Sequence, residues 1–149
     1  MENSLLDSQG NNKIEMLLNE FKDLINDMED RYNKVKCYII NDNGELTIET
    51  KDDLNDLDEM IKKLYNYKDM SIESYVELLN NLALGIDYLK KDSNLDFNLS
   101  LLNLSMFVNI FTLSCMGKFQ ILFDYFNKPL KASIKSENGL NSNLANLIN

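Results

Sequence analysis

The residues Phe97–Gly117 read FNLSLLNLSMFVNIFTLSCMG, and none of them is Asp, Glu, Lys or Arg. The rest of the chain is rich in charge, since 26% of its 149 residues are charged and its net charge is -9. An uncharged helix of this length can span a membrane, form the centre of a bundle, or leave an apolar groove open to a partner. Which of these three arrangements the helix adopts decides the fold.

Polar residues within this stretch argue against a membrane span. Its length fits, because a span needs about twenty mostly apolar residues. However, Asn, Ser or Thr recurs every few positions, and polar groups without partners are costly in hydrocarbon. Four of them fall close together on a helical wheel and predict a narrow solvent-facing seam: Asn98, Ser105, Asn109 and Thr112. We therefore expect a core helix, with an apolar groove as the alternative, that runs towards Asn127 and ends before Pro129.

Three other segments have amphipathic helical patterns, and helices formed by them can pack against such a helix. From Ile14 to Val35, apolar residues recur at steps of three and four, and Phe21 and Met28 continue a seven-residue spacing. Three heptads make a short coiled coil, so we interpret this stripe as a bundle helix. A second helix is predicted from about Lys51. A third is predicted after Ser71, which we expect to be its N-cap.

The segment 36–49, KCYIINDNGELTIE, breaks the helical period. Its β-branched and aromatic residues flank Asn43-Gly44, the dipeptide that tight hairpin turns prefer. We therefore predict strands near 36–42 and 45–49. A lone hairpin is marginally stable, so it should pack on the helices or on a partner.

Together these patterns predict a mainly α fold: a bundle of four to five helices with one β-hairpin near residues 36–49. We expect residues 1–11 to be a flexible leader, residues 12–128 to be a single helical domain, and residues 129–149 to be a weakly ordered tail. The first twenty residues lack a basic region followed by an apolar one, so we expect no secretory signal and an intracellular protein.

The residues that usually carry catalysis are missing. The chain has no His and no glycine-rich phosphate loop. NDNGE resembles part of a calcium loop, but aligning Gly44 places Ile39 and Thr50 where carboxylates are required. Cys37 and Cys115 follow no metal or redox spacing. We predict a non-enzyme with no catalytic residues, no cofactor and no metal.

The acidic balance restricts the class of partner. Arg31 is the only arginine and no basic face is evident, so we expect no direct binding to nucleic acid or to anionic lipid. One acidic cluster is interpreted as a solvated helix face rather than a cation site: Asp52, Asp53, Asp56, Asp58 and Glu59.

One family pattern occurs in the second half of the chain. Gly85-Ile86-Asp87-Tyr88-Leu89 is followed by the leucine-rich Leu99–Leu113, by Met116-Gly117-Lys118 and by Ile121–Phe126. This order resembles the N-terminal domain of the neuroguidin-like family of nucleolar processome factors and nuclear exosome cofactors. The resemblance covers roughly residues 75–130. It implies a nuclear or nucleolar docking adaptor for RNA processing; without it, a cytoplasmic protein is expected.

We therefore predict a non-catalytic protein–protein interaction adaptor that binds through helix–helix packing. The alternatives are a small viral bundle that binds host apoptosis or immune-signalling proteins, and a subunit of a coiled-coil assembly; a homo-oligomer stays open. Two surfaces are candidates, the stripe from Ile14 and the exposed edge of the long helix. Their candidate contact residues are Ile14, Phe21, Met28, Phe107, Phe111, Phe119 and Phe123. The other interpretation of all seven is ordinary core packing.

Overall fold

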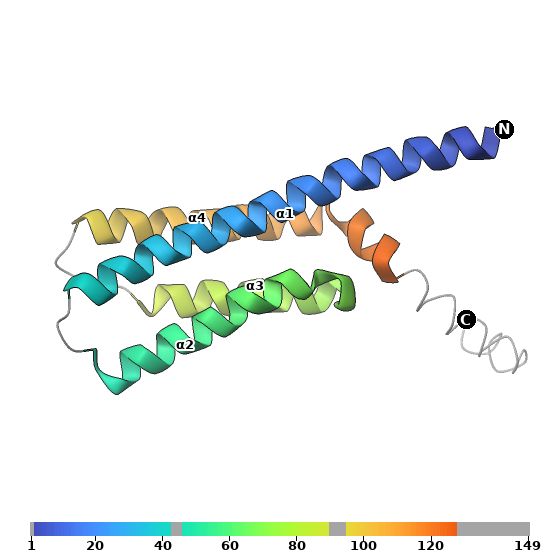
Figure 1. The fold of residues 1–149 in the computed structure, drawn as a ribbon. Coiled ribbons are helices and arrows are strands. Elements are labelled where there is room, and N and C mark those ends of the chain that lie inside the picture. Colours follow the sequence, from blue (N-terminus) through green and yellow to red (C-terminus); the bar gives the residue numbers. More distant parts are fainter. Residues whose placement is uncertain (1, 43–45, 90–94, 128–149) are drawn as a thin grey trace, which may run out of the picture.

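The computed structural model describes residues 2–42, 46–89 and 95–127. Its long helices are α1 (Glu2–Asp42), α2 (Ile48–Lys63), α3 (Ile72–Asp87) and α4 (Leu95–Met116). A short 3-10 helix, η1 (Leu64–Asp69), follows α2 directly, and residues 120–127 are helical again after a turn at 117–119. Consecutive long helices run in opposite directions (Figure 1), so the described residues form an up-down-up-down bundle. The prediction of a mainly α fold is confirmed.

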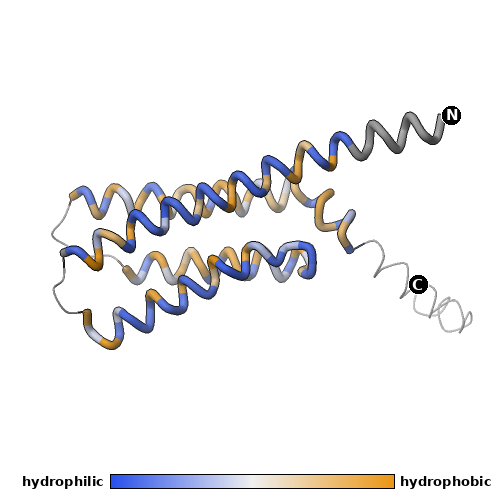
Figure 2. The backbone as a smooth tube through the Cα atoms, viewed as in Figure 1, coloured by the Kyte–Doolittle hydropathy of each residue, from blue (hydrophilic) through white to orange (hydrophobic). Residues whose placement is uncertain are grey.

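One stripe of α1 faces the bundle along most of the helix. Its buried side chains recur at alternating steps of four and three residues: Phe21, Ile25, Met28, Tyr32, Val35 and Ile39. That spacing keeps them on one side of a helix with 3.6 residues per turn. Figure 2 shows the resulting alternation of hydrophilic and hydrophobic positions along α1 and α2.

The predicted β-hairpin is wrong for the residues that the structure describes. Residues 36–42 are the last turns of α1, and α2 already begins at Ile48; the predicted turn itself, residues 43–45, lies outside the described residues. Packing explains the difference. Val35 and Ile39 continue the buried stripe of α1, and a lone hairpin would have had no sheet to join.

The observed start agrees with the sequence-based prediction for α3 but not for α2. Ser71 caps α3 as predicted, because its side chain accepts a hydrogen bond from the main-chain nitrogen of Ser74 at 3.1 Å. The second helix starts earlier than expected: Thr47 is its N-cap and accepts a hydrogen bond from the main-chain nitrogen of Thr50.

The predicted leader and the predicted tail flank the predicted helical domain. Residues 2–11, predicted as a flexible leader, are helical in the structure, and this part of α1 extends beyond the other helices (Figure 1). The predicted tail, residues 129–149, lies outside the described residues.

An aromatic cluster closes the core where α1, α3, α4 and η1 meet. Its centre is Phe21, which is completely buried. Five ring centroids lie 5.0–5.8 Å from that of Phe21, in tilted or edge-on arrangements: Tyr67, Tyr75, Phe111, Phe119 and Phe123. Aromatic pairs at such distances stabilise a core by about 0.5–1.5 kcal/mol each beyond their burial. The segment after α4 is thereby held against the bundle.

The other half of the bundle is held by contacts to α2. The hydroxyl of Tyr32 donates a hydrogen bond to the carbonyl of Leu54 at 3.0 Å. Lys36 forms an ion pair with Asp58, with Nζ 2.9 Å from Oδ2. Both contacts join α1 to α2, so α2 is positioned by polar as well as apolar interactions.

Candidate interaction surface on α4

α4 is apolar on two opposite faces. Its inner face packs against α1 and α3 and consists of Phe97, Leu101, Leu104, Val108, Phe111 and Cys115, all buried. Its outer face carries a second apolar stripe whose members keep between 53% and 71% of their surface exposed. We call this stripe the α4 outer face; it consists of Leu95, Leu99, Leu102, Met106, Ile110, Leu113 and Met116. Steps of three and four residues place these side chains along one line of the helix.

This arrangement differs from the expected polar seam. Asn98, Ser105 and Thr112 are half-buried, and only Asn109 is exposed. The Thr112 hydroxyl donates to the carbonyl of Val108 at 2.8 Å, which satisfies it within the helix. The solvent-facing side of α4 is therefore mainly apolar, with Asn103 and Asn109 as its exposed amides, because α1 and α3 cover the opposite side of the helix.

The structure places most of the predicted contact residues inside the core. Five of the seven are at most 1% exposed: Phe21, Met28, Phe111, Phe119 and Phe123. The expected exposed edge of the long helix is therefore absent at Phe111, Phe119 and Phe123. Ile14 and Phe107 are half-buried. Phe107 also lies under the guanidinium of Arg31, whose carbon is 4.4 Å from the ring centroid, so its outer side is occupied.

Sequence reasoning missed the α4 outer face although a signal for it exists. Leu99, Met106 and Leu113 stand at seven-residue intervals, and Leu95, Leu102 and Met116 share a second register of the same spacing. In a helix that is apolar all round, this pattern does not tell which face its neighbours cover. The positions of α1 and α3 in the structure decide which face of α4 is covered.

Charged groups border the α4 outer face at its two ends. Asp96 lies in the first turn of α4, and Lys118 follows its last turn. Lys118 forms an ion pair with Glu20 of α1. Between Asp96 and Lys118 the sequence has no charged residue. The face is therefore uncharged along its length and has opposite charges at its ends.

A depression of about 460 Å³ lies between α1 and α4 next to this face. Arg31 lines it, with Nε 3.0 Å from Oδ1 of Asp27, and also donates a hydrogen bond to Asn103. These polar side chains bind one another, and Leu99 contributes an apolar wall. The contacts of Arg31 with Asp27 and Asn103 thus connect α1 to α4 across the depression.

Titratable side chains inside the bundle are protonated near neutral pH. Burial raises the pKa values of Tyr75 and Tyr32 above the ordinary value of 10.0. Burial also raises the pKa of the Cys115 thiol to about 12, which makes it a poor nucleophile. In the described part of the chain, every buried side-chain nitrogen or oxygen has a hydrogen-bond partner, and no three His, Cys, Asp or Glu groups could hold a metal ion.

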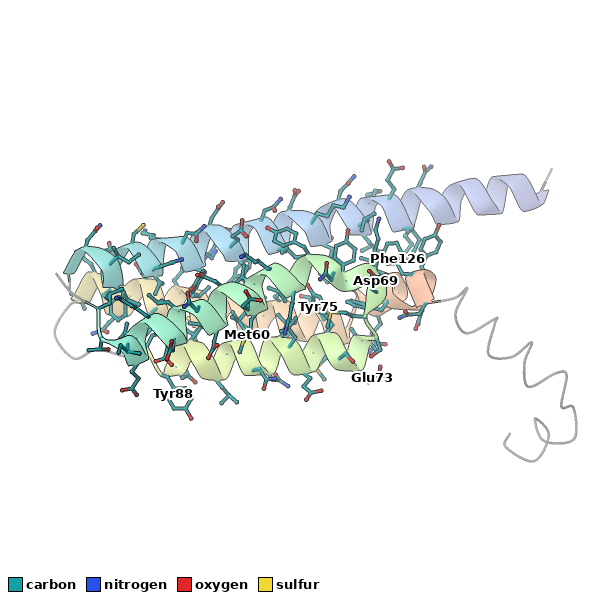
Figure 3. All side chains as sticks on the ribbon, turned by 60° about the horizontal axis from the view of Figure 1, so that its bottom comes forward. Met60, Asp69, Glu73, Tyr75, Tyr88 and Phe126 are labelled. Atoms are coloured by element: carbon teal, nitrogen blue, oxygen red, sulfur yellow. The ribbon has the colours of Figure 1, made fainter. Side chains whose placement is uncertain are left out.

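Two other features of the sequence, the acidic cluster and the Gly85–Leu89 segment, lie on α2 and at the end of α3. Asp58 of the acidic cluster is held by Lys36, whereas Asp52, Asp56 and Glu59 are exposed. The Gly85–Leu89 segment ends α3 and begins the following turn. Figure 3 shows Tyr88 of this segment projecting outward, while Tyr75 lies among the helices.

For the residues that the structure describes, the fold and the surface define a class: an up-and-down bundle of four long helices in which the other described helices leave the apolar outer face of α4 uncovered. By length and composition, α4 could also cross a membrane; its mean hydropathy is 1.6 over an 18-residue window, of which 33% is buried in the bundle. Core helices of soluble proteins meet the same criterion, so this property is weak evidence. Comparisons with protein-family models, with curated proteins and with solved structures find no match for this chain.

Proposed function

We propose that this protein is a non-catalytic interaction module that binds a protein partner through the α4 outer face. The observation that carries the proposal is the exposure of seven large apolar side chains in one stripe. Monomeric soluble proteins rarely expose contiguous apolar patches above a few hundred Å², and larger patches mark interaction sites. A stripe with three- and four-residue steps is the pattern by which one helix docks along another.

The inner face of α4 favours docking over insertion into a membrane. Six of its side chains are buried against α1 and α3. If α4 entered a bilayer alone, these contacts would be lost and the core of the bundle would be exposed. If the bundle entered as a whole, the charged outer faces of α1 and α2 would be placed in hydrocarbon, which is costly. A protein partner avoids both costs.

The proposal is tested by placing charges in the α4 outer face. In a double variant, Leu102→Glu and Leu113→Glu, both substitutions are at exposed positions, so the thermal unfolding midpoint should stay close to that of the natural protein. The matched control is Met16→Glu with Ile48→Glu, two even more exposed apolar positions on α1 and α2. Tagged proteins are crosslinked in their native cells, and the recovered partners, including further copies of the chain, are compared.

The natural protein and the control should recover the same partners, and the α4 variant should lose them. Equal recovery by all three proteins would contradict docking through this face. The identity of the partners then tests the predicted role in RNA processing: exosome or processome subunits would support it, and host death or immune-signalling proteins would support the viral alternative.

A further inference from the structure

The spacing of the α4 outer face is nearly symmetric about its middle residue. Counted from Met106, the other members lie at positions -11, -7, -4, +4, +7 and +10. When two such helices pack antiparallel, position +7 of one lies opposite position -7 of the other. Leu99 would then meet Leu113 of the second helix, Leu102 would meet Ile110, and Met106 would meet its own equivalent. The stripe is thus complementary to a reversed copy of itself.

We propose that the α4 outer face binds a second copy of this chain, with the two α4 helices antiparallel about a twofold axis at Met106. This inference rests on the proposed function and names its partner. Twofold dimers are the commonest oligomers, and their interfaces require self-complementary surfaces. The seven-residue registers of Leu99 and Leu102 are those that allow side chains of two helices to interdigitate.

The charges at the ends of α4 favour the antiparallel orientation. Antiparallel pairing brings Asp96 of each copy towards Lys118 of the other, which remains about half exposed beside Glu20. Parallel pairing would instead place Asp96 next to Asp96 and Lys118 next to Lys118. Opposed helix dipoles add to the preference. Each end of the pair is therefore complementary in charge.

The exposed area is of the size that a dimer requires. Seven large side chains that are more than half exposed present roughly several hundred Å² per copy, on the order of the ~800 Å² per partner of standard interfaces. The net charge of -9 opposes association between copies, but the face itself carries no charge. Salt screens this repulsion, so dimerisation should strengthen as ionic strength rises.

Sedimentation equilibrium of the full chain over a dilution series tests the association. We expect the natural protein to reach twice its 17.3 kDa mass and Met106→Glu to remain at that mass. The control Ile48→Glu, which adds the same charge at another exposed position, should dimerise like the natural protein. A dimer that persists unchanged in Met106→Glu would overturn the assignment to this face.

Disulfide trapping in a Cys37→Ser background tests the orientation. Met106→Cys should crosslink to itself on mild oxidation, because the axis places its two copies face to face. Leu99→Cys should not crosslink alone but should crosslink when mixed with Leu113→Cys. Self-crosslinking of Leu99→Cys would show parallel helices and overturn the proposed geometry.

Three other outcomes would overturn the second-copy proposal in distinguishable ways. A monomer in which the thiol introduced by Met106→Cys reacts rapidly with a maleimide leaves the face free, and partner capture then decides the proposed function. A monomer in which that thiol is protected would show that another segment of the same chain covers the face, which would contradict both proposals. If the protein floats with phosphatidylcholine vesicles and Met106→Glu abolishes this co-flotation, the face binds a lipid surface. That result would also contradict both proposals.

Discussion

The hydroxyl of Tyr75 in α3 donates a hydrogen bond of 2.8 Å to the main-chain carbonyl of Leu64, where α2 passes into η1. Both residues are fully buried. The bond holds the α2–η1 junction to α3 beside the aromatic cluster around Phe21. A polar group has been buried here together with its partner, so the bond should contribute to stability.

We expect Tyr75→Phe to lower the free energy of unfolding by about 1 kcal/mol, because it keeps the ring and removes only the donor. The measurement is urea unfolding followed by circular dichroism. Tyr88→Phe is the matched control: Tyr88 is 81% exposed, so removing its hydroxyl should leave the unfolding free energy unchanged. Equal stability of Tyr75→Phe and the natural protein would show that this bond makes no net contribution.

Alkaline pH should destabilise the fold through its buried tyrosines. Burial raises the pKa of Tyr75 and of Tyr32, for which the nearby Asp58 carboxylate adds a smaller effect. Their hydroxyls ionise near pH 10.0 in the unfolded chain but at higher pH in the folded one. Their contribution is therefore complete below pH 10 and is lost as the pH rises above it.

The test compares unfolding free energies at about pH 8 and about pH 11. The double variant Tyr32→Phe with Tyr75→Phe should lose less stability over this interval than the natural protein, whereas Tyr88→Phe should match the natural protein. Cys115, with an ordinary pKa of 9.0 raised to about 12, acts in the same direction in all three proteins. An identical decline in the double variant would contradict the assignment to these tyrosines.

Gly85 allows α3 to approach α2 closely. A Cβ atom at this position would lie 2.7 Å from Cδ2 of Leu57, a side chain that is itself buried. Gly85→Val should therefore destabilise the fold by about 1–3 kcal/mol, as overpacking does. Asn81→Val, an exposed position one turn earlier on α3, controls for the cost of a β-branched residue in a helix.

Coupling to Leu57 separates a steric cause from a general helix effect. In a Leu57→Ala background the space for the valine is open, so Gly85→Val should cost clearly less there than in the natural protein. Thermal or urea unfolding of the four proteins in this cycle gives the coupling energy. Additive effects of the two substitutions would show that contact with Leu57 is not the cause.

The two cysteines should react at very different rates. Both are free thiols, but Cys37 is exposed on α1 whereas Cys115 is buried on the inner face of α4. With a thiol reagent at neutral pH, we expect Cys37 to be labelled rapidly and Cys115 to react only when the bundle opens. Mass spectrometry of labelled peptides measures both rates, and Cys37→Ser should remove the fast reaction alone.

Much of the fold follows from local patterns. The three- and four-residue steps from Ile14 to Val35, the amphipathic pattern from about Lys51, and Ser71 as a cap each predict the helix that forms. These signals work because periodicity and caps act within a few turns of helix. Residues 36–42 are predicted as strand but are helical, because burial of Ile39 in the bundle outweighs a weak local preference for strand.

The sequence by itself determined that the chain is mainly helical, that 97–117 is its most apolar helix, and that the chain lacks histidine chemistry. Only the tertiary structure decided which side of that helix is covered. α1 and α3 pack on the side of Leu104 and Phe111 and leave that of Met106 open. Both sides are equally apolar in sequence, so periodicity cannot distinguish them; the distinction comes from where the neighbouring helices lie in space.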